Sequence, residues 1–434
     1  MHHVHNFVQS EKMPFEDSVR AFLPHCSYIP LSQEKDSLYS CLVHKGETVC
    51  EGQVIAVAED SRKKNSDIHS PIPGKVEDIF ETPYPDGRKG QVVKISLSGS
   101  FSYLGKKKNG IDWKSFSPDY LESLFIQKGV DNTFSIPHSL ASDISDSRKH
   151  KSSVLVVRCF DSDPSLMTDS FITEHYFDAV AEGSFIIAKA LDAKVVVFAF
   201  SEGKEFSLDK YDFGKIEKKS CLVDTRFYPC GFKNDLIKAV KALATDKESI
   251  FNSVNHKSLF IDSVTALAAD DAVVYGKPAV ERFVHVTGNC LRSAAMFCVR
   301  IGTTIGSLAL QCGGFKSECG QIVINGLLSG FSVDSLDVPV SRNIKSVAFI
   351  PANEMHRERT APCIRCGQCR SVCPQGLFPD LVYRNETGGK HSGLQLLEFS
   401  RLCSDCGLCN SVCASRLPLA QTMKLLRKKY EDKI

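Results

Sequence analysis

CIRCGQCRSVCP, at residues 363–374, decides the fold of one end of this chain, and CSDCGLCNSVC, at residues 403–413, repeats its cysteine spacing. Three cysteines at two-residue intervals let one tight loop surround three corners of a cubane, whereas the fourth cysteine points away toward another cluster. A glycine after the second cysteine of each motif relieves crowding of the backbone. Ala414 follows the second motif where proline is usual, but proline shapes the backbone and is not a ligand. The spacing is therefore typical of a pair of [4Fe–4S] clusters.

Because the fourth cysteine of each motif points away, we predict that the two clusters exchange their fourth ligands. The first cluster is expected to be held by Cys363, Cys366, Cys369 and Cys413, and the second by Cys403, Cys406, Cys409 and Cys373. Two zinc sites are the alternative, since C-x2-C pairs also bind zinc. Four cysteines in each of two motifs favour iron–sulfur clusters. The remaining ten cysteines form no such pairs, and we expect them to be small buried side chains.

The composition of the whole chain narrows the class of protein. The chain has 434 residues, with 53 basic and 51 acidic side chains and a hydrophobic share of 43%. This length predicts two to four domains, and the near-neutral charge gives no electrostatic reason to expect nucleic acid as a partner. Because we find no secretory signal and no apolar run near the roughly 20 residues of a membrane helix, we expect a reducing cytosol and no transmembrane segment. His2, His3 and His5 could bind a metal, although a mobile terminus explains them more simply.

Hydrophobic patterns divide the rest of the chain into β-rich and alternating regions. Short strands with glycine and proline turns are predicted near 38–43, 52–58, 74–76 and 91–97, which is typical of a small barrel or sandwich. Polar stretches at 99–118 and 139–152 are predicted to be linkers or loops. Strands then alternate with helices, which predicts a mostly parallel α/β sheet. The predicted strands lie at 153–158, 193–200 and 258–260, and the predicted helices at 172–191, 234–244 and 262–274.

Beyond the α/β region, residues 281–345 return to short strands and glycine turns, with one helix near 303–311. Residues 417–434 are predicted to form a basic amphipathic helix with Leu419, Met423, Leu426 and Tyr430 on one face. Such a helix would cap the cysteine-rich domain, and a docking helix for membrane partners is the alternative.

With these elements in place, residues 363–419 resemble the ferredoxin-like end of RnfC, the peripheral subunit of the Rnf ion-pumping electron-transport complex. Further segments resemble the family in the same order along nearly the whole chain: residues 30–33, 45–47, 52–53, 69–76, 228–231, 266–288, 300–302 and 337–340. The resemblance implies a multidomain α/β plus β protein with four domains. These are a barrel-sandwich hybrid with a linker (1–118), a Rossmann-like α/β domain (119–278), a β-grasp-like SLBB domain (279–348) and a two-cluster ferredoxin-like α domain (349–434).

The implied α/β domain is related to the NADH- and FMN-binding subunit of respiratory complex I, but its phosphate loop is altered here. The family's loop has the form GxGGAGFP, whose backbone N–H groups approach phosphate closely. In residues 127–137, only Gly129 and Pro137 of that pattern remain. A loop with one glycine cannot wrap a dinucleotide in the same way, which argues against direct use of NADH.

The next family motif, Glu-Cys-Glu-Pro, stands here as DSDP at residues 161–164, which keeps the acidic character with shorter side chains. In this respect the chain resembles NqrA, the related subunit of the sodium-pumping NADH:quinone reductase, which lacks the cluster motifs. FMN remains a candidate cofactor, and the resemblance implies Lys128, Asp161 and Asp163 as the residues near it. The alternative is that these three residues are ordinary loop residues with no part in cofactor binding.

The resemblance implies an electron-transfer subunit of an Rnf-type complex, held on the cytoplasmic side of the inner membrane by the other subunits. Electrons would enter from a soluble donor, which could be NADH, a ferredoxin or a flavoprotein, and leave to membrane partners. One alternative is a soluble flavin and iron–sulfur reductase of the corrinoid-reductase type, which would need a working flavin site. Another is a non-catalytic assembly subunit whose clusters hold the fold.

Overall fold

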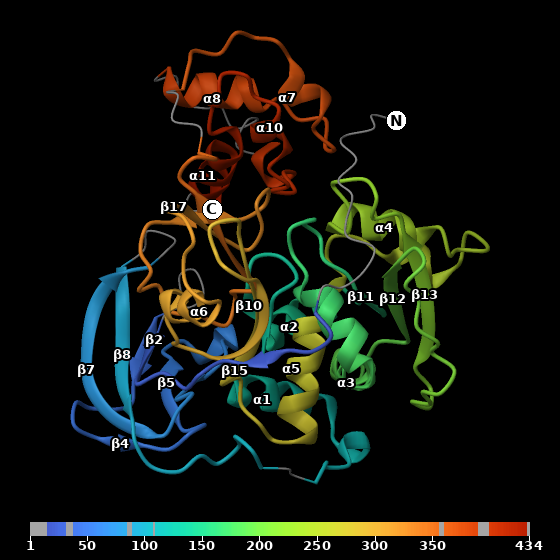
Figure 1. Cartoon of the computed structure of the whole chain (residues 1–434). Helices are drawn as coiled ribbons and strands as arrows, with labels where there is room; N and C mark the ends of the chain where they lie inside the picture. The colour runs from blue at the N-terminus through green and yellow to red at the C-terminus, as the bar shows by residue number, and fades with distance from the viewer. Residues whose placement is uncertain are drawn as a thin grey trace.

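The computed structural model shows a β-rich N-terminal part, a parallel α/β part, a second sheet and a C-terminal helical unit, which lies at the top of Figure 1. The structure describes residues 15–31, 38–84, 89–106, 109–355, 360–388 and 399–431. His2, His3 and His5, which the sequence analysis considered as metal ligands, lie outside these described residues.

The N-terminal part consists of two antiparallel sheets, in the orders β2-β8-β7-β4 and β3-β5-β6. Alternate side chains such as Ile29, Ile55 and Ile95 are fully buried between them. The strands predicted near 52–58 and 91–97 are confirmed as β5 and β8. The bounds are β2 Cys26–Pro30, β3 Tyr39–Cys41, β4 Thr48–Val49, β5 Val54–Ala58, β6 Ile68–His69, β7 Gly74–Pro83 and β8 Lys89–Leu97.

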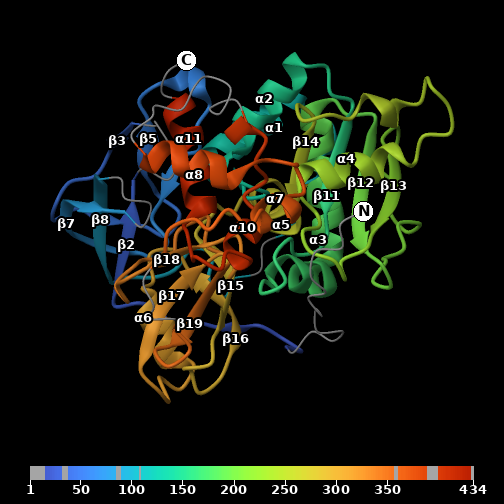
Figure 2. The ribbon, with the colours of Figure 1, turned by 90° about the horizontal axis from the view of Figure 1, so that it is seen from above.

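The α/β part is built on a parallel sheet in the order β13-β12-β11-β14, as the alternating pattern predicted. Leu155 and Val157 of β11 face a core shared with α3 and α5, whereas Val154 and Val156 face a core shared with α4. Helices therefore cover both faces of the sheet (Figures 1 and 2). The bounds are β11 Val154–Arg158, α3 Thr168–Leu191, β12 Val195–Ser201, β13 Glu217–Val223, α4 Lys233–Lys241, β14 Leu259–Asp262 and α5 Ser263–Val274.

Several elements here were not expected. The polar stretch at 139–152 forms helix α2, Leu140–Lys149, because its few apolar residues, Leu140 and Ile144 among them, fall on one buried face. The predicted linker contains Trp113, whose indole Nε1 donates to Glu182 Oε1 over 2.8 Å. The edge strand β13 was missed because its outer residues are polar. The additional elements in this region are η2 Trp113–Ser115, α1 Pro118–Lys128, β9 Asp131–Asn132 and β10 His138–Ser139.

The second large sheet has the order β1-β16-β15-β19-β17-β18 and is covered by α6. Its edge strand β1 comes from the start of the described chain, where Val19 pairs with Phe297 of β16 in parallel. The helix predicted near 303–311 is confirmed as α6. The bounds are β1 Val19–Arg20, β15 Glu281–Thr287, β16 Ala295–Arg300, α6 Ile305–Gln311, β17 Cys319–Ile324, β18 Phe331–Val333 and β19 Ser346–Pro351.

The C-terminal unit packs short helices around small apolar cores. The predicted amphipathic helix is confirmed as α11, in which Leu419, Met423 and Leu426 are each 1% exposed. Met423 and Leu426 pack with Val382 of α8, so this apolar face covers the unit's own core. The side chain of Tyr430 lies outside the described part. The bounds are α7 Gln368–Ser371, α8 Pro379–Thr387, α10 Leu408–Ser411 and α11 Leu419–Glu431.

Candidate functional site

The two cysteine motifs adopt the same backbone conformation. Arg365 and Asp405, each just before the second cysteine of its motif, have φ values of 58° and 57°. Gly367 and Gly407, each just after that cysteine, have φ values of 77° and 74° and begin α7 and α10. The two left-handed residues, one on each side of the second cysteine, curl each motif into a tight loop, and this conformation favours glycine at the position after the cysteine.

Each loop encloses a cavity lined by four cysteines. The first cavity is lined by Cys363, Cys366, Cys369 and Cys413. The second is lined by Cys403, Cys406, Cys409 and Cys373. Each cavity thus takes three cysteines from one motif and the last cysteine of the other, which is the grouping that the spacing predicts.

The cysteines surround these cavities without converging on a point. Among the residues that the structure describes, no three His, Cys, Asp or Glu side chains lie close enough to hold one metal ion. A tetrahedral zinc site would draw four sulfurs to within about 3.8 Å of one another, given a Zn–S bond of about 2.3 Å. In a [4Fe–4S] cluster each thiolate binds a different iron, so the sulfurs stand around a larger volume. The residues present fit the cluster better than they fit a single ion.

The protein environment of the thiols is apolar. Burial raises the pKa of Cys403 to about 12 and also raises the pKa of Cys409. Leu377 and Met423 line the second cavity beside these cysteines. Leu377 N–H and Leu417 N–H donate to the sulfurs of Cys373 and Cys413, each over 3.4 Å. Hydrogen bonds to sulfur and burial are the two properties through which a protein tunes cluster potentials.

The second cavity faces the body of the protein and the first faces outward. The Tyr228 hydroxyl donates to the Cys406 carbonyl over 2.5 Å, and both residues pack with Leu328. A Cβ on Gly407 would lie 1.9 Å from the Leu328 carbonyl oxygen, so only glycine fits this contact. At the first cavity, by contrast, Cys366 is exposed and Ile364 is 67% exposed. A cluster in the first cavity would therefore be the one nearer to solvent.

The flavin candidates from the sequence lie in loops of the α/β part. Asp161 is fully buried and accepts from the N–H groups of Asp169 and Ser170 over 3.0 and 2.9 Å, at the start of α3. Its carboxylate therefore caps that helix. Lys128 ends α1 and is partly exposed, and its carbonyl accepts from Ala279 N–H over 2.8 Å.

Asp163 is fully buried and connects the α/β part to the turn after β17. It accepts from the N–H groups of Ser165, Leu328 and Ser329 over 3.0, 3.0 and 2.9 Å. Two of these donors lie beside the contact that holds Gly407. Asp163 thus supports the surface on which the C-terminal unit rests.

A buried charge network lies at the carboxyl ends of β11 and β14, and sequence reasoning missed it. Lys345 Nζ lies 2.7 Å from Asp169 Oδ2 and 2.5 Å from Asp262 Oδ2. Arg158 Nη2 lies 3.6 Å from the same Asp169 oxygen. The Thr133 hydroxyl donates to Asp262 over 2.9 Å. No local spacing could have revealed the network, because Lys345 is 176 residues from Asp169.

Burial and mutual attraction shift the carboxylates of this network in opposite directions. Burial raises the pKa of Asp169 to about 6. Burial alone would also raise the pKa of Asp262, but attraction to Lys345 and Arg158 lowers it below its usual value. In parallel α/β sheets ligands bind outside the carboxyl ends of the strands. In this protein the carboxyl edge of the sheet is occupied by the buried charged side chains, and Thr133 of the altered glycine loop forms a hydrogen bond to one of them, Asp262.

Comparisons with known proteins agree with the resemblance seen in the sequence. Residues 2–100 match the family model described as the RnfC barrel sandwich hybrid domain. A component of the proton-translocating ferredoxin:NAD(+) oxidoreductase complex of Clostridium ljungdahlii is 25% identical over 83% of this chain and 78% of its own length. A component of the ion-translocating oxidoreductase complex of Rhodobacter capsulatus is 26% identical over 87% of this chain and 71% of its own length.

Among solved structures, an NAD+-reducing [NiFe]-hydrogenase aligns with a TM-score of 0.48 and 12% identity, over 74% of this chain and 64% of the hydrogenase chain. No helix in the described part of the chain is both long and apolar enough to cross a membrane. The domain match and the curated relatives confirm the resemblance to RnfC, and the chain is related to the RnfC-type components of ion-translocating oxidoreductase complexes.

Proposed function

We propose that this chain is an electron-transfer subunit of an Rnf-type ion-translocating complex and that it holds two [4Fe–4S] clusters. The observation that carries the proposal is the pair of cavities, each lined by four cysteines of mixed origin. Bound clusters would supply one-electron transfer between a donor and the partner subunits. The protein's own part is to hold them in place, exclude water and orient N–H groups toward sulfur.

The assignment of ligands follows the grouping in the structure. The first cluster would be bound by Cys363, Cys366, Cys369 and Cys413, and the second by Cys403, Cys406, Cys409 and Cys373. The unit at 349–434 is proposed to be a two-cluster ferredoxin-like domain, and residues 279–348 a β-grasp-like SLBB domain. The different exposure of the two cavities supports an order, in which the first cluster exchanges electrons with a partner and the second faces the body.

The electron donor is proposed to be a reduced protein rather than NADH. The place where a parallel sheet usually binds a ligand is occupied by Lys345 and its partners, and the glycine loop is altered. A flavin, if the holoprotein carries one, is expected near Lys128, Asp161 and Asp163, where the two carboxylates order the surrounding backbone. The other Rnf-type subunits are the proposed partners, on the cytoplasmic side of the inner membrane.

The test is anaerobic purification of the full chain, with iron, sulfide and flavin measured on one sample. We expect about eight irons per chain from two four-iron clusters, and electron paramagnetic resonance of the dithionite-reduced protein should show two interacting centres. Cys366→Ser and Cys406→Ser should each lower the iron content by up to about four and remove a different signal. Cys50→Ser, which alters an exposed cysteine outside both cavities, is the control. Stoichiometric zinc, or unchanged iron in both variants, would contradict the proposal.

Addition of NADH to the same sample tests whether the α/β part oxidises NADH or whether the chain receives electrons from another protein. A relay that receives electrons from another protein should keep its visible spectrum after NADH and lose absorbance with a reduced ferredoxin. Bleaching by NADH together with bound flavin would establish a working NADH site and overturn the proposal that the donor is a reduced protein. If no physiological donor reduces the clusters, the non-catalytic assembly subunit would be the remaining alternative.

A further inference from the structure

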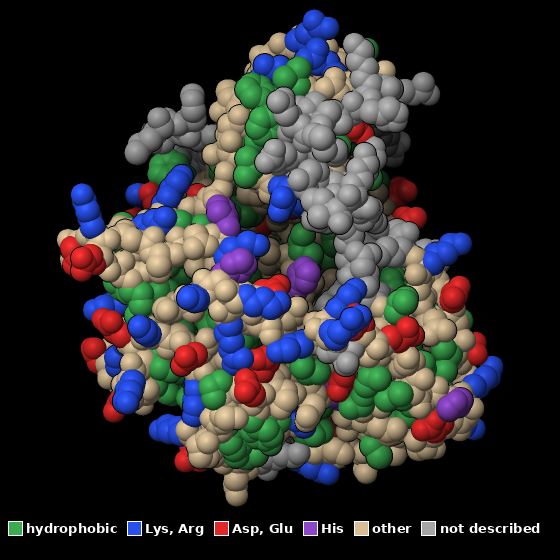
Figure 3. Space-filling view, turned by 180° about the vertical axis from the view of Figure 1, so that it is seen from behind, with side chains coloured by type: hydrophobic (Ala, Val, Ile, Leu, Met, Phe, Trp, Pro, Cys, Tyr) green, Lys and Arg blue, Asp and Glu red, His purple; other side chains and the backbone are tan. Residues whose placement is uncertain are grey.

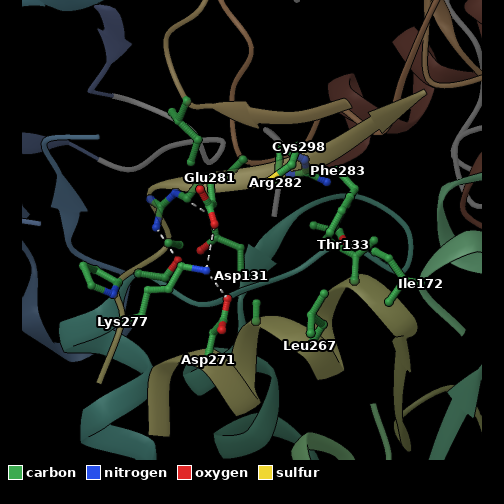
Figure 4. Close-up of a pocket in the computed structure, with 17 residues that line it drawn as sticks. Asp131, Thr133, Ile172, Leu267, Asp271, Lys277, Glu281, Arg282, Phe283 and Cys298 are labelled. Carbon is green, nitrogen blue, oxygen red and sulfur yellow. Dashed lines mark hydrogen bonds and ion pairs between the residues drawn. The ribbon is translucent and has the colours of Figure 1, made fainter. Parts of the chain in front are cut away.

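A cavity outside the cysteine motifs lies between helix α5 and strand β15 (Figure 4). Leu267 and Asp271 rise into it from α5, and Glu281, Arg282 and Phe283 reach it from β15. Apolar side chains form much of its wall. The cavity therefore lies between the α/β part and the second large sheet. No step of the proposed electron transfer uses it.

Most charges around this cavity are matched in pairs. Lys277 Nζ lies 2.7 Å from Asp271 Oδ2 and 2.9 Å from Glu281 Oε1. On the other side, Arg342 Nε lies 3.2 Å from Asp131 Oδ2. These contacts neutralise two of the three basic side chains that line the cavity.

Arg282 is the third basic side chain, and its guanidinium is not matched in this way. The residue is 7% exposed, and its Nε and Nη2 atoms are buried without a hydrogen-bond partner among the described residues. Burial lowers the pKa of Arg282 to about 10, although Asp262, Asp169 and Asp131 attract it from a distance. A buried charged donor without a partner is costly. The Oδ1 atom of Asp131, on the same cavity, also has no hydrogen-bond partner among the described residues.

We propose that this cavity binds a small organic carboxylate, whose carboxyl group pairs with the Arg282 guanidinium and whose apolar body lies against Leu267 and Phe283. The planar fork of a guanidinium matches a carboxylate with two parallel hydrogen bonds. The Asp131 Oδ1 atom would accept a hydrogen bond from a hydroxyl or amide of the ligand. This chemistry differs from cluster binding and does not depend on it.

The test uses the full-length holoprotein with benzoate as the probe and benzyl alcohol as its uncharged analogue. Benzoate should bind in calorimetry and raise the melting temperature, and benzyl alcohol should have a much smaller effect. Arg282→Gln should weaken benzoate binding at least tenfold. Arg292→Gln, which alters an exposed arginine in the loop between β15 and β16, should bind benzoate like the unaltered protein.

The stability of the variants without ligand is the second readout. Because Arg282 is a buried charge without a direct partner among the described residues, Arg282→Gln should melt at or above the temperature of the unaltered protein. Arg282→Lys keeps the charge but loses the fork, so it should fold and bind benzoate weakly. Strong destabilisation by both variants would show a structural role and overturn the proposal. Equal benzoate binding by Arg282→Gln and the unaltered protein, or no binding by either, would overturn it as well.

Discussion

Lys345 bridges two buried aspartates at the carboxyl edge of the parallel sheet. Its ammonium contacts both Asp169 and Asp262, which are fully buried. Lys345→Met would leave two buried carboxylates without the ammonium group that both of them contact. Breaking a buried pair in this way costs about 3–5 kcal/mol. We expect a loss of that size in denaturant unfolding.

Lys204→Met, at an exposed position of the α/β part, is the matched control and should change stability little. If Lys345→Met proved as stable as the control, the network would not hold this edge together.

Asp270 of α5 gives a pH dependence of stability. Burial raises its pKa to about 8, helped by the charges of Asp271 and Glu182. The unfolded chain loses this proton near pH 4, because the ordinary pKa of aspartate is about 3.9. Between these values the folded state binds more protons, so this group makes stability fall as pH rises from 4 to 8. Relative to the unaltered protein, the stability of Asp270→Asn should rise between pH 4 and pH 8 by about 1.4 kcal/mol per pH unit.

Thermal unfolding across this pH range measures the effect. An Asp270→Asn difference that does not grow with pH would show that this carboxyl titrates normally.

Helices α3 and α5 meet at Gly183, and this contact sets their spacing. A Cβ at Gly183 would lie 1.9 Å from the carbonyl oxygen of Ala266 in α5. Because that oxygen belongs to the backbone, it cannot move without the helix. Gly183→Ala should therefore destabilise the protein by about 1–3 kcal/mol, despite the higher helix propensity of alanine.

Glu174→Ala, on the exposed side of the same helix, is the control. Urea unfolding that ranks the two variants alike would show that the helices do not rely on this close approach.

The C-terminal helical unit rests on the rest of the molecule through the second cysteine loop. In Figures 1 and 2 this unit lies over the second sheet and the α/β part. The hydroxyl of Tyr228 holds the carbonyl of Cys406 at this contact. Removal of the hydroxyl by Tyr228→Phe should cost about 1 kcal/mol and speed hydrogen exchange around residues 403–408.

Tyr120→Phe, at an exposed position of α1, should leave the exchange unchanged. Protection of 403–408 that survives Tyr228→Phe would mean that apolar packing alone holds the unit.

The surface of the molecule seen from behind shows Lys and Arg interspersed with Asp and Glu (Figure 3), in keeping with the near balance of charge in the sequence.

Elements whose formation depends on near neighbours in the chain could be predicted from the amino-acid sequence. The alternation of strands and helices from β11 to α5 follows from local hydrophobic periods, and the amphipathic pattern identified α11. The cysteine spacing also predicts which cysteines share a cluster, and this ligand assignment stays a prediction. Helix α2 and strand β13 were not predicted, because most of their residues are polar and only a narrow face of each is buried.

The contacts between these elements could be seen only once the whole chain was folded. Lys345 reaches Asp169 across 176 residues and Asp262 across 83, and Tyr228 reaches Cys406 across 178. Arg282 lies in a cavity whose walls come from distant segments. Such contacts follow from how whole elements pack, and no period or spacing within the chain encodes them. Burial then sets the charge state of these groups, because desolvation depends on all neighbours at once.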